Sequence, residues 1–232
     1  NNSGEYALED IDFTAKKGQT IGVIGGTGSG KSTLASLIPR FYDISKGELK
    51  IDGTNAADYD TTALRQRIGV VPQKAVLFSG TIAENMRWGK RDATDEEIWK
   101  ALETAQAKEF VEKMPDGLNT HIAQGGKNLS GGQKQRLTIA RALVSQPDIL
   151  ILDDSASALD FATDAALRKA IAQNTTGMTT FIISQRANSI MQADRIIVLD
   201  DGKQVGLGTH KELLENCDVY REICYSQLSK EE

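Results

Sequence analysis

The amino-acid sequence predicts an α/β fold built on a mostly parallel sheet. Short β-like runs alternate with helical patterns along most of the 232 residues. The runs at 149–152, 181–183 and 196–199 are continuously apolar and rich in Ile, Val and Leu, which is typical of strands covered on both faces. A glycine-rich loop also joins a β-like run to a helical pattern, as in the βα units of parallel sheets.

Five strands are expected in the α/β core, at residues 19–25, 67–73, 148–154, 179–184 and 195–200. The dipeptide Asp201-Gly202 separates the last strand from another β-like run, and it predicts a hairpin. A further strand is expected at residues 7–13, in an N-terminal antiparallel β part.

Helical patterns dominate residues 81–146, which we interpret as an α-helical subdomain inserted into the core. Thr94 and Glu97 have the spacing of a capping box at the start of a helix expected over 94–114. A second helix is expected over 131–146, where a proline follows. We therefore expect one domain over residues 1–232, with residues 1–80 and 147–232 as its α/β core.

The composition favours a globular protein that does not bind nucleic acid. The net charge is -5, with 40% hydrophobic and 25% charged residues, whereas phosphate contacts need a basic face. His121 and His210 lie far apart without ligand-like neighbours, so no zinc site is expected. No run of about 18 apolar residues exists to span a bilayer.

The two cysteines bear on the cellular compartment of the protein, and the first residue bears on whether the chain is part of a longer one. Cys217 and Cys224 are seven residues apart in an expected C-terminal helix, so apolar packing on one face is favoured over a disulfide. This predicts a reduced, intracellular protein. The chain starts at Asn1 rather than Met, and we expect it to be a fragment of something longer.

Residues 25–33, GGTGSGKST, fit the phosphate-loop pattern Gly-x-x-x-x-Gly-Lys-Ser/Thr. Glycines allow backbone N–H groups to converge on phosphate oxygens, and the following helix adds partial positive charge. Lys31 is expected to reach the β- and γ-phosphates, and the Ser32 hydroxyl to bind Mg²⁺. The alternative is a glycine-rich turn that binds nothing. The candidate nucleotide-binding residues are Gly25, Gly26, Thr27, Gly28, Ser29, Gly30, Lys31, Ser32 and Thr33.

An apolar run at 149–152 ends in two acids, Asp153 and Asp154. A strand that ends in an acid about a hundred residues after a phosphate loop is the expected second half of such a site. Asp153 would hold Mg²⁺, directly or through water.

The segment LSGGQ at 129–133, extended as LSGGQKQRLTIARAL, resembles the signature of the ATP-binding cassette (ABC) family. With the phosphate loop, VVPQ at 70–73 and SALD at 157–160, the order of motifs matches a cassette over nearly the whole chain. The resemblance implies a P-loop NTPase core of the RecA-like type, ATP and Mg²⁺ as cofactors, and a second cassette as partner.

In that family the signature of one cassette closes on the ATP held by the other. The resemblance therefore implies nucleotide contacts from Ser130, Gly131, Gly132 and Gln133. Gln73 resembles the glutamine that reaches Mg²⁺ and the attacking water, and Asp160 resembles the aspartate at the interface between cassettes.

Segments 41–53, 76–89 and 208–214 resemble the exporter branch, in which the cassette follows a membrane domain. This implies a transmembrane domain upstream of residue 1 and a location at the cytoplasmic face of the membrane. The aromatic residue that stacks on adenine is then expected at or before Asn1, and Tyr6 is a poor substitute for it.

Three positions depart from the family pattern. Asp154 replaces the catalytic Glu, Gln185 replaces the switch His, and Gln124 replaces a Glu ahead of the signature. Asp is shorter than Glu by about 1.5 Å, and a misplacement of about 1 Å can cost a hundredfold in rate, so Asp154 is expected to be a poor base. Gln185 can donate a hydrogen bond but carries no charge. The alternative is neutral drift in a site that still works.

The candidate catalytic residues are Lys31, Gln73, Asp154 and Gln185, and the candidate metal ligands are Ser32, Gln73 and Asp153. An intact signature beside an impaired site resembles one half of a heterodimeric exporter, in which a different subunit carries the working base. The alternatives are a soluble cassette of DNA maintenance or translation, and a regulatory ATP-binding domain.

Overall fold

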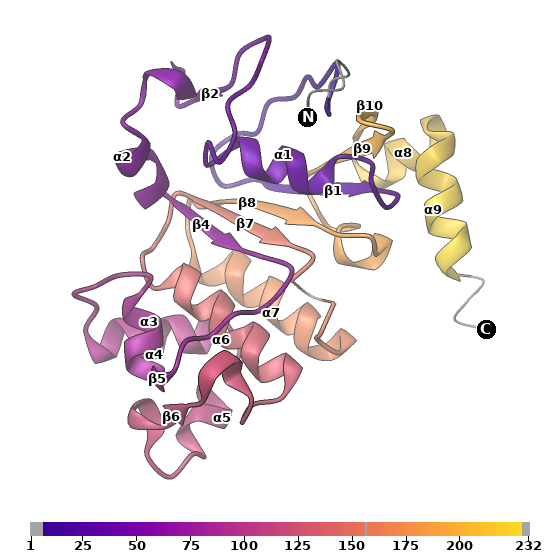
Figure 1. Ribbon diagram of the computed structural model, residues 1–232. Helices are drawn as coiled ribbons and strands as arrows, with labels where there is room; N and C mark the ends of the chain where they lie inside the picture. Colours follow the sequence, from indigo (N-terminus) through magenta and orange to yellow (C-terminus); the bar gives the residue numbers. More distant parts are fainter. Residues whose placement is uncertain (1–6, 156, 229–232) are drawn as a thin grey trace. The chain divides into compact units, whose positions relative to one another are not determined.

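The computed structural model describes residues 7–155 and 157–228. Two compact units make up the chain (Figure 1). Unit 1 comprises residues 1–68 and 179–232, and unit 2 comprises residues 69–178.

Unit 1 is built around strands in the order β10-β9-β1-β8. Their bounds are Thr20–Gly25 for β1, Thr179–Ile183 for β8, Arg195–Asp200 for β9 and Lys203–Gly208 for β10. β1 is parallel to both β8 and β9, and Val23 lies opposite Ile183 and Ile197. Every residue of β8 is buried, as the continuous apolar runs predict. The α/β class with a mostly parallel sheet is therefore confirmed.

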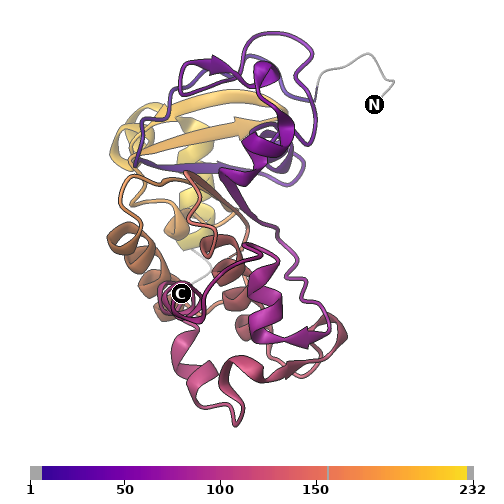
Figure 2. The same ribbon diagram turned by 90° about the vertical axis from the view of Figure 1, so that its left-hand side faces the viewer.

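The predicted hairpin joins β9 to antiparallel β10 (Figure 2). Asp201 and Gly202 have φ values of 44° and 75°, and two residues with positive φ are what a type I′ turn needs. The strand expected at 7–13 is wrong. Asp10 takes a φ of 54° and interrupts the extended backbone, so only an isolated bridge from Glu9 to Lys203 forms. The antiparallel part near the N-terminus is the short pair β2 (Lys50–Ile51) and β3 (Thr54–Asn55).

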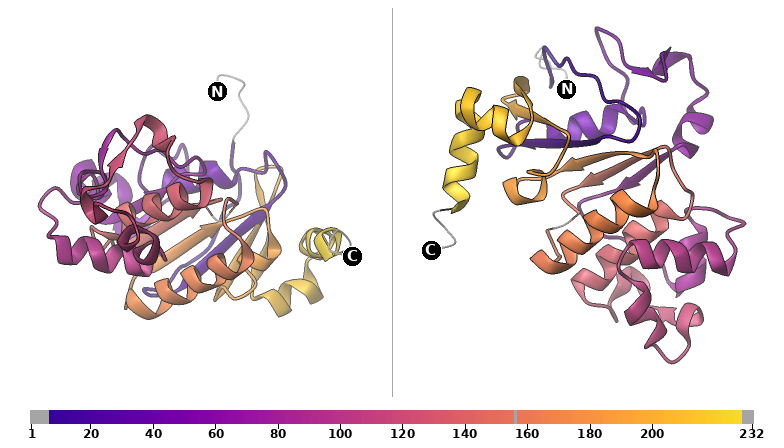
Figure 3. Two further views of the ribbon diagram at one scale, coloured as in Figure 1. Left: turned by 90° about the horizontal axis from the view of Figure 1, so that it is seen from below. Right: turned by 180° about the vertical axis from the view of Figure 1, so that it is seen from behind.

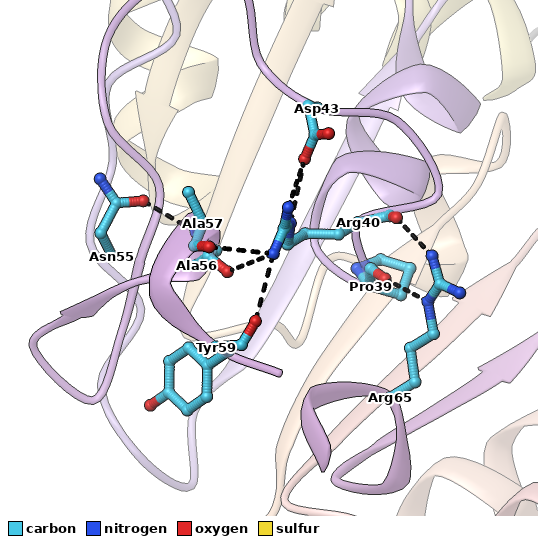
Figure 4. A network of polar contacts seen from close by, with 8 residues as sticks. All are labelled: Pro39, Arg40, Asp43, Asn55, Ala56, Ala57, Tyr59 and Arg65. Carbon is cyan, nitrogen blue, oxygen red and sulfur yellow. Dashed lines mark hydrogen bonds and ion pairs between the residues drawn. The ribbon is translucent and has the colours of Figure 1, made fainter. Parts of the chain in front are cut away.

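Helix α1 (Lys31–Leu37) follows β1 and packs on β1 and β8. After it, two arginines hold the segment that leads through η1 (Ala56–Asp58) to α2 (Thr61–Gln66) (Figure 4). Arg40 Nη1 donates to the carbonyl oxygens of Ala56, Ala57 and Tyr59 at 3.0, 3.3 and 3.4 Å. Arg65 donates to the carbonyl oxygens of Pro39 and Arg40 at 3.0 and 2.6 Å. Carbonyl oxygens of an irregular, partly buried segment thus accept hydrogen bonds from charged donors.

The C-terminal end of unit 1 is a helix pair, α8 (His210–Asn216) and α9 (Asp218–Leu228) (Figure 3). Cys217 lies between them in extended conformation, with φ -129° and ψ 107°, so the expected single helix for both cysteines is wrong. Both thiols are buried and free, which confirms apolar packing. Burial raises the pKa of the Cys224 thiol.

Unit 2 contains β4 (Ile68–Val71) from Gly69 onward, and β4 lies beside β7 (Ile149–Asp153). The remaining elements are β5 (Gly80–Thr81), α3 (Ile82–Arg87), α4 (Asp95–Thr104), α5 (Lys108–Glu112), η2 (Gly117–Asn119), β6 (His121–Ile122), η3 (Gln124–Gly126), α6 (Gly131–Leu143) and α7 (Phe161–Asn174). Helix α6 packs on α3 and α4 around side chains such as Leu102 and Leu137, both fully buried. In the part of the chain that the structure describes, no helix has the length and hydropathy of a membrane span.

The helix expected over 94–114 is two helices. Its predicted capping box is present, because Thr94 Oγ1 accepts from Glu97 N at 3.2 Å and Glu97 accepts from Thr94 N at 3.0 Å. Gln106 then takes a φ of 59°, and Ala107 N donates to Leu102 O at 2.7 Å. This is a Schellman ending. Glycine is the usual residue there, so the sequence hides the break.

Candidate functional site

The glycine-rich loop is held tightly at its start and open at its middle. A Cβ at Gly25 would lie 2.2 Å from Leu199 O and 2.4 Å from Ser29 Oγ, so no larger residue fits where β1 ends. Gly26 and Gly28 are exposed, and a Cβ at either would meet nothing within 4 Å. The loop therefore keeps room beside its backbone for a ligand.

Lys31 begins α1 and folds back over the loop. Its ammonium group donates to Gly25 O at 2.8 Å and to Gly26 O at 2.7 Å. The residue is only 9% exposed. Among the described residues, no side chain caps α1, because Gly30 occupies the N-cap position. A buried cation and uncapped backbone amides make this loop suitable for phosphate.

Unit 1 brings Gln185 to the same sheet edge as the loop. β1 and β8 are parallel, and Ser184 N donates to Val23 O at 3.0 Å. The carboxyl ends of parallel strands meet at one edge, so the residues that follow Gly25 and Ile183 share that edge. Gln185 itself is exposed there.

Unit 2 brings Gln73 to Asp154. Gln73 follows β4, Asp154 follows β7, and the amide Nε2 of Gln73 donates to Asp154 Oδ2 at 3.0 Å. Asp154 has a φ of 46°, in the left-handed region that Asp tolerates better than most residues. Since Nε2 is used by Asp154, the Oε1 atom of Gln73 is the one left to act as a metal ligand.

The signature starts helix α6 with a capping box. Ser130 Oγ accepts from Gln133 N at 3.2 Å, and Gln133 Oε1 accepts from Ser130 N at 2.9 Å. Gly131 is exposed, and a Cβ added to it would lie 4.0 Å from Ala158 Cβ. The predicted nucleotide contact from Gln133 therefore competes with a structural role of its side chain.

Asp160 caps helix α7. Its carboxylate accepts from Thr163 N at 2.9 Å and from Thr163 Oγ1 at 2.8 Å. These hydrogen bonds, the backbone one first, lower the pKa of Asp160. The Asp-x-x-Thr spacing could have revealed this cap from the sequence. Gln124 lies exposed in η3, and Tyr6 lies outside the described residues.

The candidate metal ligands suit Mg²⁺. Ser32, Gln73 and Asp153 offer a hydroxyl, an amide oxygen and a carboxylate, all hard oxygen donors. Within residues 7–155 and 157–228, no cluster of three or more His, Cys, Asp or Glu side chains could enclose a metal. Mg²⁺ needs no such cage, since it usually keeps water and binds substrate phosphates besides one or two protein ligands.

A phosphate loop between a parallel strand and a helix, with a buried lysine on it, defines a nucleotide-binding α/β domain. A family model described as ABC transporter matches residues 8–157. The chain belongs to the ABC transporter family.

Similar proteins extend the match over nearly the whole chain. The ABC transporter ATP-binding protein YfiB of Bacillus subtilis is 49% identical over 225 residues, which cover 97% of this chain and 39% of YfiB. YgaD of Bacillus subtilis, named for multidrug export, is 43% identical over 219 residues, which cover 94% of this chain and 38% of YgaD.

A solved bacterial exporter of the Atm1 family, with ATP bound, has a TM-score of 0.93 and 36% identity. The match covers 97% of this chain and 40% of the exporter chain. This chain thus spans about two fifths of the length of the relatives it matches, and it is an exporter-like ATP-binding domain.

Proposed function

We propose that this chain binds and hydrolyses ATP to power export across a membrane, as one half of a heterodimer. The observation that carries the proposal is an asymmetry between its own site and its signature. The signature helix has an intact LSGGQ with a complete capping box, whereas Asp154 and Gln185 stand where the family has Glu and His.

At the chain's own site, the loop residues bind and orient the nucleotide. The backbone amides of residues 26–32 and the Lys31 ammonium hold the β- and γ-phosphates. Ser32, Gln73 and Asp153 would hold Mg²⁺, which would supply positive charge to offset the negative charge of the phosphates. Gln185 donates a hydrogen bond to the γ-phosphate.

Hydrolysis at this site is slow because the base is short. The attacking water must lose a proton as its oxygen bonds to the γ-phosphorus, while the bond from that phosphorus to the bridging oxygen breaks and releases ADP. Asp154 falls short of the proton by about 1.5 Å relative to Glu. One of its oxygens also accepts the hydrogen bond from Gln73, so a lone pair of that oxygen is already engaged.

The signature serves a second, different ABC domain. Ser130, Gly131, Gly132 and Asp160 would lie against the ATP held by that partner, whose site supplies the working Glu. The partner's own signature is expected to be altered. A transmembrane domain upstream of residue 1 would place both ATP-binding domains at the cytoplasmic face.

A complementation assay tests the arrangement in trans. One copy carries Lys31→Met and keeps its signature; the other carries Ser130→Asp with Asp154→Glu and Gln185→His. Each copy alone should hydrolyse little ATP at high protein concentration, whereas the mixture should exceed their sum. A mixture that equals the sum would contradict a signature that acts in trans.

A purely regulatory ATP-binding domain is the second candidate, favoured by the same two replacements at 154 and 185. It predicts that Asp154→Glu with Gln185→His leaves hydrolysis near the background of Lys31→Met. A soluble cassette of DNA maintenance or translation is disfavoured, because residues 81–146 form short helices rather than a long coiled coil.

A further inference from the structure

A glutamine near the end of α9 makes hydrogen bonds to the backbone of Gln185 and of Ala187, on either side of Arg186. Gln227 Nε2 donates to Gln185 O at 2.7 Å, and Ala187 N donates to Gln227 Oε1 at 2.8 Å. We propose that Gln227 is a positioning residue, which fixes the backbone at 185–187 and thereby aims the Gln185 side chain. The inference rests on the proposed function, in which Gln185 meets the γ-phosphate.

The two hydrogen bonds fix the amide of Gln227 in one orientation. A flipped amide would place Oε1 against the Gln185 carbonyl and Nε2 against the Ala187 N–H group, and both contacts would be repulsive. The bonds use backbone atoms only, so they do not depend on which side chain stands at position 185. They would persist in a Gln185 variant, which makes the two positions separable by experiment.

The two hydrogen bonds of Gln227 form a clamp on the short segment between Ser184 and Ala187. Ser184 is buried and fixed to β1 through its bond to Val23 O. Ala187 is buried as well and starts η4 (Ala187–Ser189). Only Gln185 and Arg186 are exposed between these anchors. Two hydrogen bonds hold the peptide group between them: Arg186 N donates to Ser184 Oγ at 2.9 Å, and Gln185 O accepts from Gln227.

Helix α9, which carries Gln227, is held in place by packing and by hydrogen bonds. Tyr220, Cys224 and Gln227 follow the four- and seven-residue spacing of one helical face, and α9 contacts β9 and η4 (Figure 3). Tyr220 is fully buried, and its hydroxyl lies 2.7 Å from His210 Nδ1. Arg221 Nη1 donates to the last carbonyls of α8, at 3.0 Å for Leu214 O.

The orientation of the side chain toward the γ-phosphate matters more for a glutamine at position 185 than for a histidine. A protonated imidazole attracts phosphate by charge over a range of angles. A neutral amide acts through a hydrogen bond, which weakens steeply once the angle falls far from linear. The replacement at 185 thus makes the backbone path of the loop a larger part of γ-phosphate recognition.

Amide hydrogen exchange of the nucleotide-free chain tests the clamp itself. Gln227→Met keeps the length of the side chain and removes both hydrogen bonds. The Ala187 amide should then exchange about fivefold faster or more, from the loss of one hydrogen bond. Gln192→Met, at an exposed glutamine of the same unit, is the matched control and should leave that rate unchanged.

Nucleotide affinity tests the positioning role. Gln227→Met should reduce the preference for Mg²⁺–ATPγS over Mg²⁺–ADP by about threefold to tenfold, with ADP affinity unchanged. Gln227→Glu presents a second acceptor to the Gln185 carbonyl and should reduce the preference at least as far. In a Gln185→Ala background, Gln227→Met should have no further effect on the preference, because the side chain that it aims is gone.

Two results would overturn the inference. One is an Ala187 exchange rate that Gln227→Met leaves unchanged. The other is an equal loss of ATPγS and ADP affinity, or a loss that persists in the Gln185→Ala background, since either means general damage to the unit. Failure of the unmodified chain to bind ADP would count instead against the proposed function, and the exchange measurement would still decide on the clamp.

Discussion

The side-chain amide of Gln73 donates a 3.0 Å hydrogen bond to the carboxylate of Asp154, across 81 residues of sequence. Asp154 directly follows the carboxyl end of β7, and Gln73 lies just beyond the carboxyl end of β4. The bond ties a candidate metal ligand to the candidate base. The candidate base is therefore shorter than Glu, and one of its carboxylate oxygens is already engaged by Gln73.

Restoring the longer side chain should restore turnover. We expect Asp154→Glu together with Gln185→His to raise the ATP hydrolysis rate about tenfold or more, because the carboxylate gains about 1.5 Å of reach. Phosphate release at saturating Mg²⁺–ATP measures the rate. Asp154→Asn, which keeps the hydrogen-bonded shape but removes the base, should give no gain, and adding Lys31→Met to the active variant should abolish it. An unchanged rate would show that these positions do not limit turnover.

Removing the ammonium of Lys31 should weaken nucleotide binding. Its two bonds to Gly25 O and Gly26 O place the charge on the loop. We expect Lys31→Met to lower the affinity for ADP by at least about tenfold, the range for hydrogen bonds to charged groups, as measured by titration calorimetry. Lys17→Met, at an exposed lysine of the same unit, is the control. Equal affinities for the two variants would mean that the loop binds nothing through Lys31.

Ser130 should act in two ways that can be separated. Ser130→Ala removes the cap of α6 and should lower the free energy of unfolding by about 1 kcal/mol. Thr94→Ala removes a matched capping box from α4 and should cost about the same. Ser130→Asp keeps a capping acceptor but brings negative charge to the signature.

Chemical denaturation measures the stability of the three variants, and the complementation assay measures their activity. We expect Ser130→Asp to keep stability and lose activity, and Thr94→Ala to lose stability and keep activity. If activity simply follows stability across the three variants, the signature is only a helix start.

Much of this arrangement could be predicted from the sequence because its signals are local. The strand that carries Gly25 and the one that carries Asp153 are apolar runs of the expected length, and the Thr94 capping box is a four-residue pattern. Ser130 likewise starts a helix where the sequence places one. Each of these features depends on neighbours along the chain.

The features that were missed depend on contacts distant in sequence or on unusual backbone angles. Asp10 and Gln106 adopt positive φ values, which no residue other than glycine signals reliably. The bonds from Gln73 to Asp154 and from Gln227 to the Gln185 loop join segments 81 and about 40 residues apart. The sequence around a glutamine does not indicate which distant residue its amide will bond, so these partners are seen only in the folded chain.

Protonation of Asp160 should remove part of the stability of α7. Its carboxylate caps the helix through Thr163, and its pKa in the folded chain lies below the ordinary value, chiefly because of the Thr163 backbone N–H. A lowered pKa means that the stabilising contribution is present above about pH 4 and is lost as pH falls through the folded pKa. The negative charge also interacts favourably with the N-terminus of the helix.

Asp160→Asn keeps an oxygen that can accept from Thr163 but does not titrate. We expect the native chain to unfold at a higher temperature than this variant at pH 7 and pH 5, with the difference closing toward pH 3. Asp116→Asn is the matched control, since within the described residues Asp116 precedes η2 without a capping bond from its side chain. A difference that stays constant from pH 7 to pH 3 would contradict a charged cap, and so would the same pH trend in Asp116→Asn.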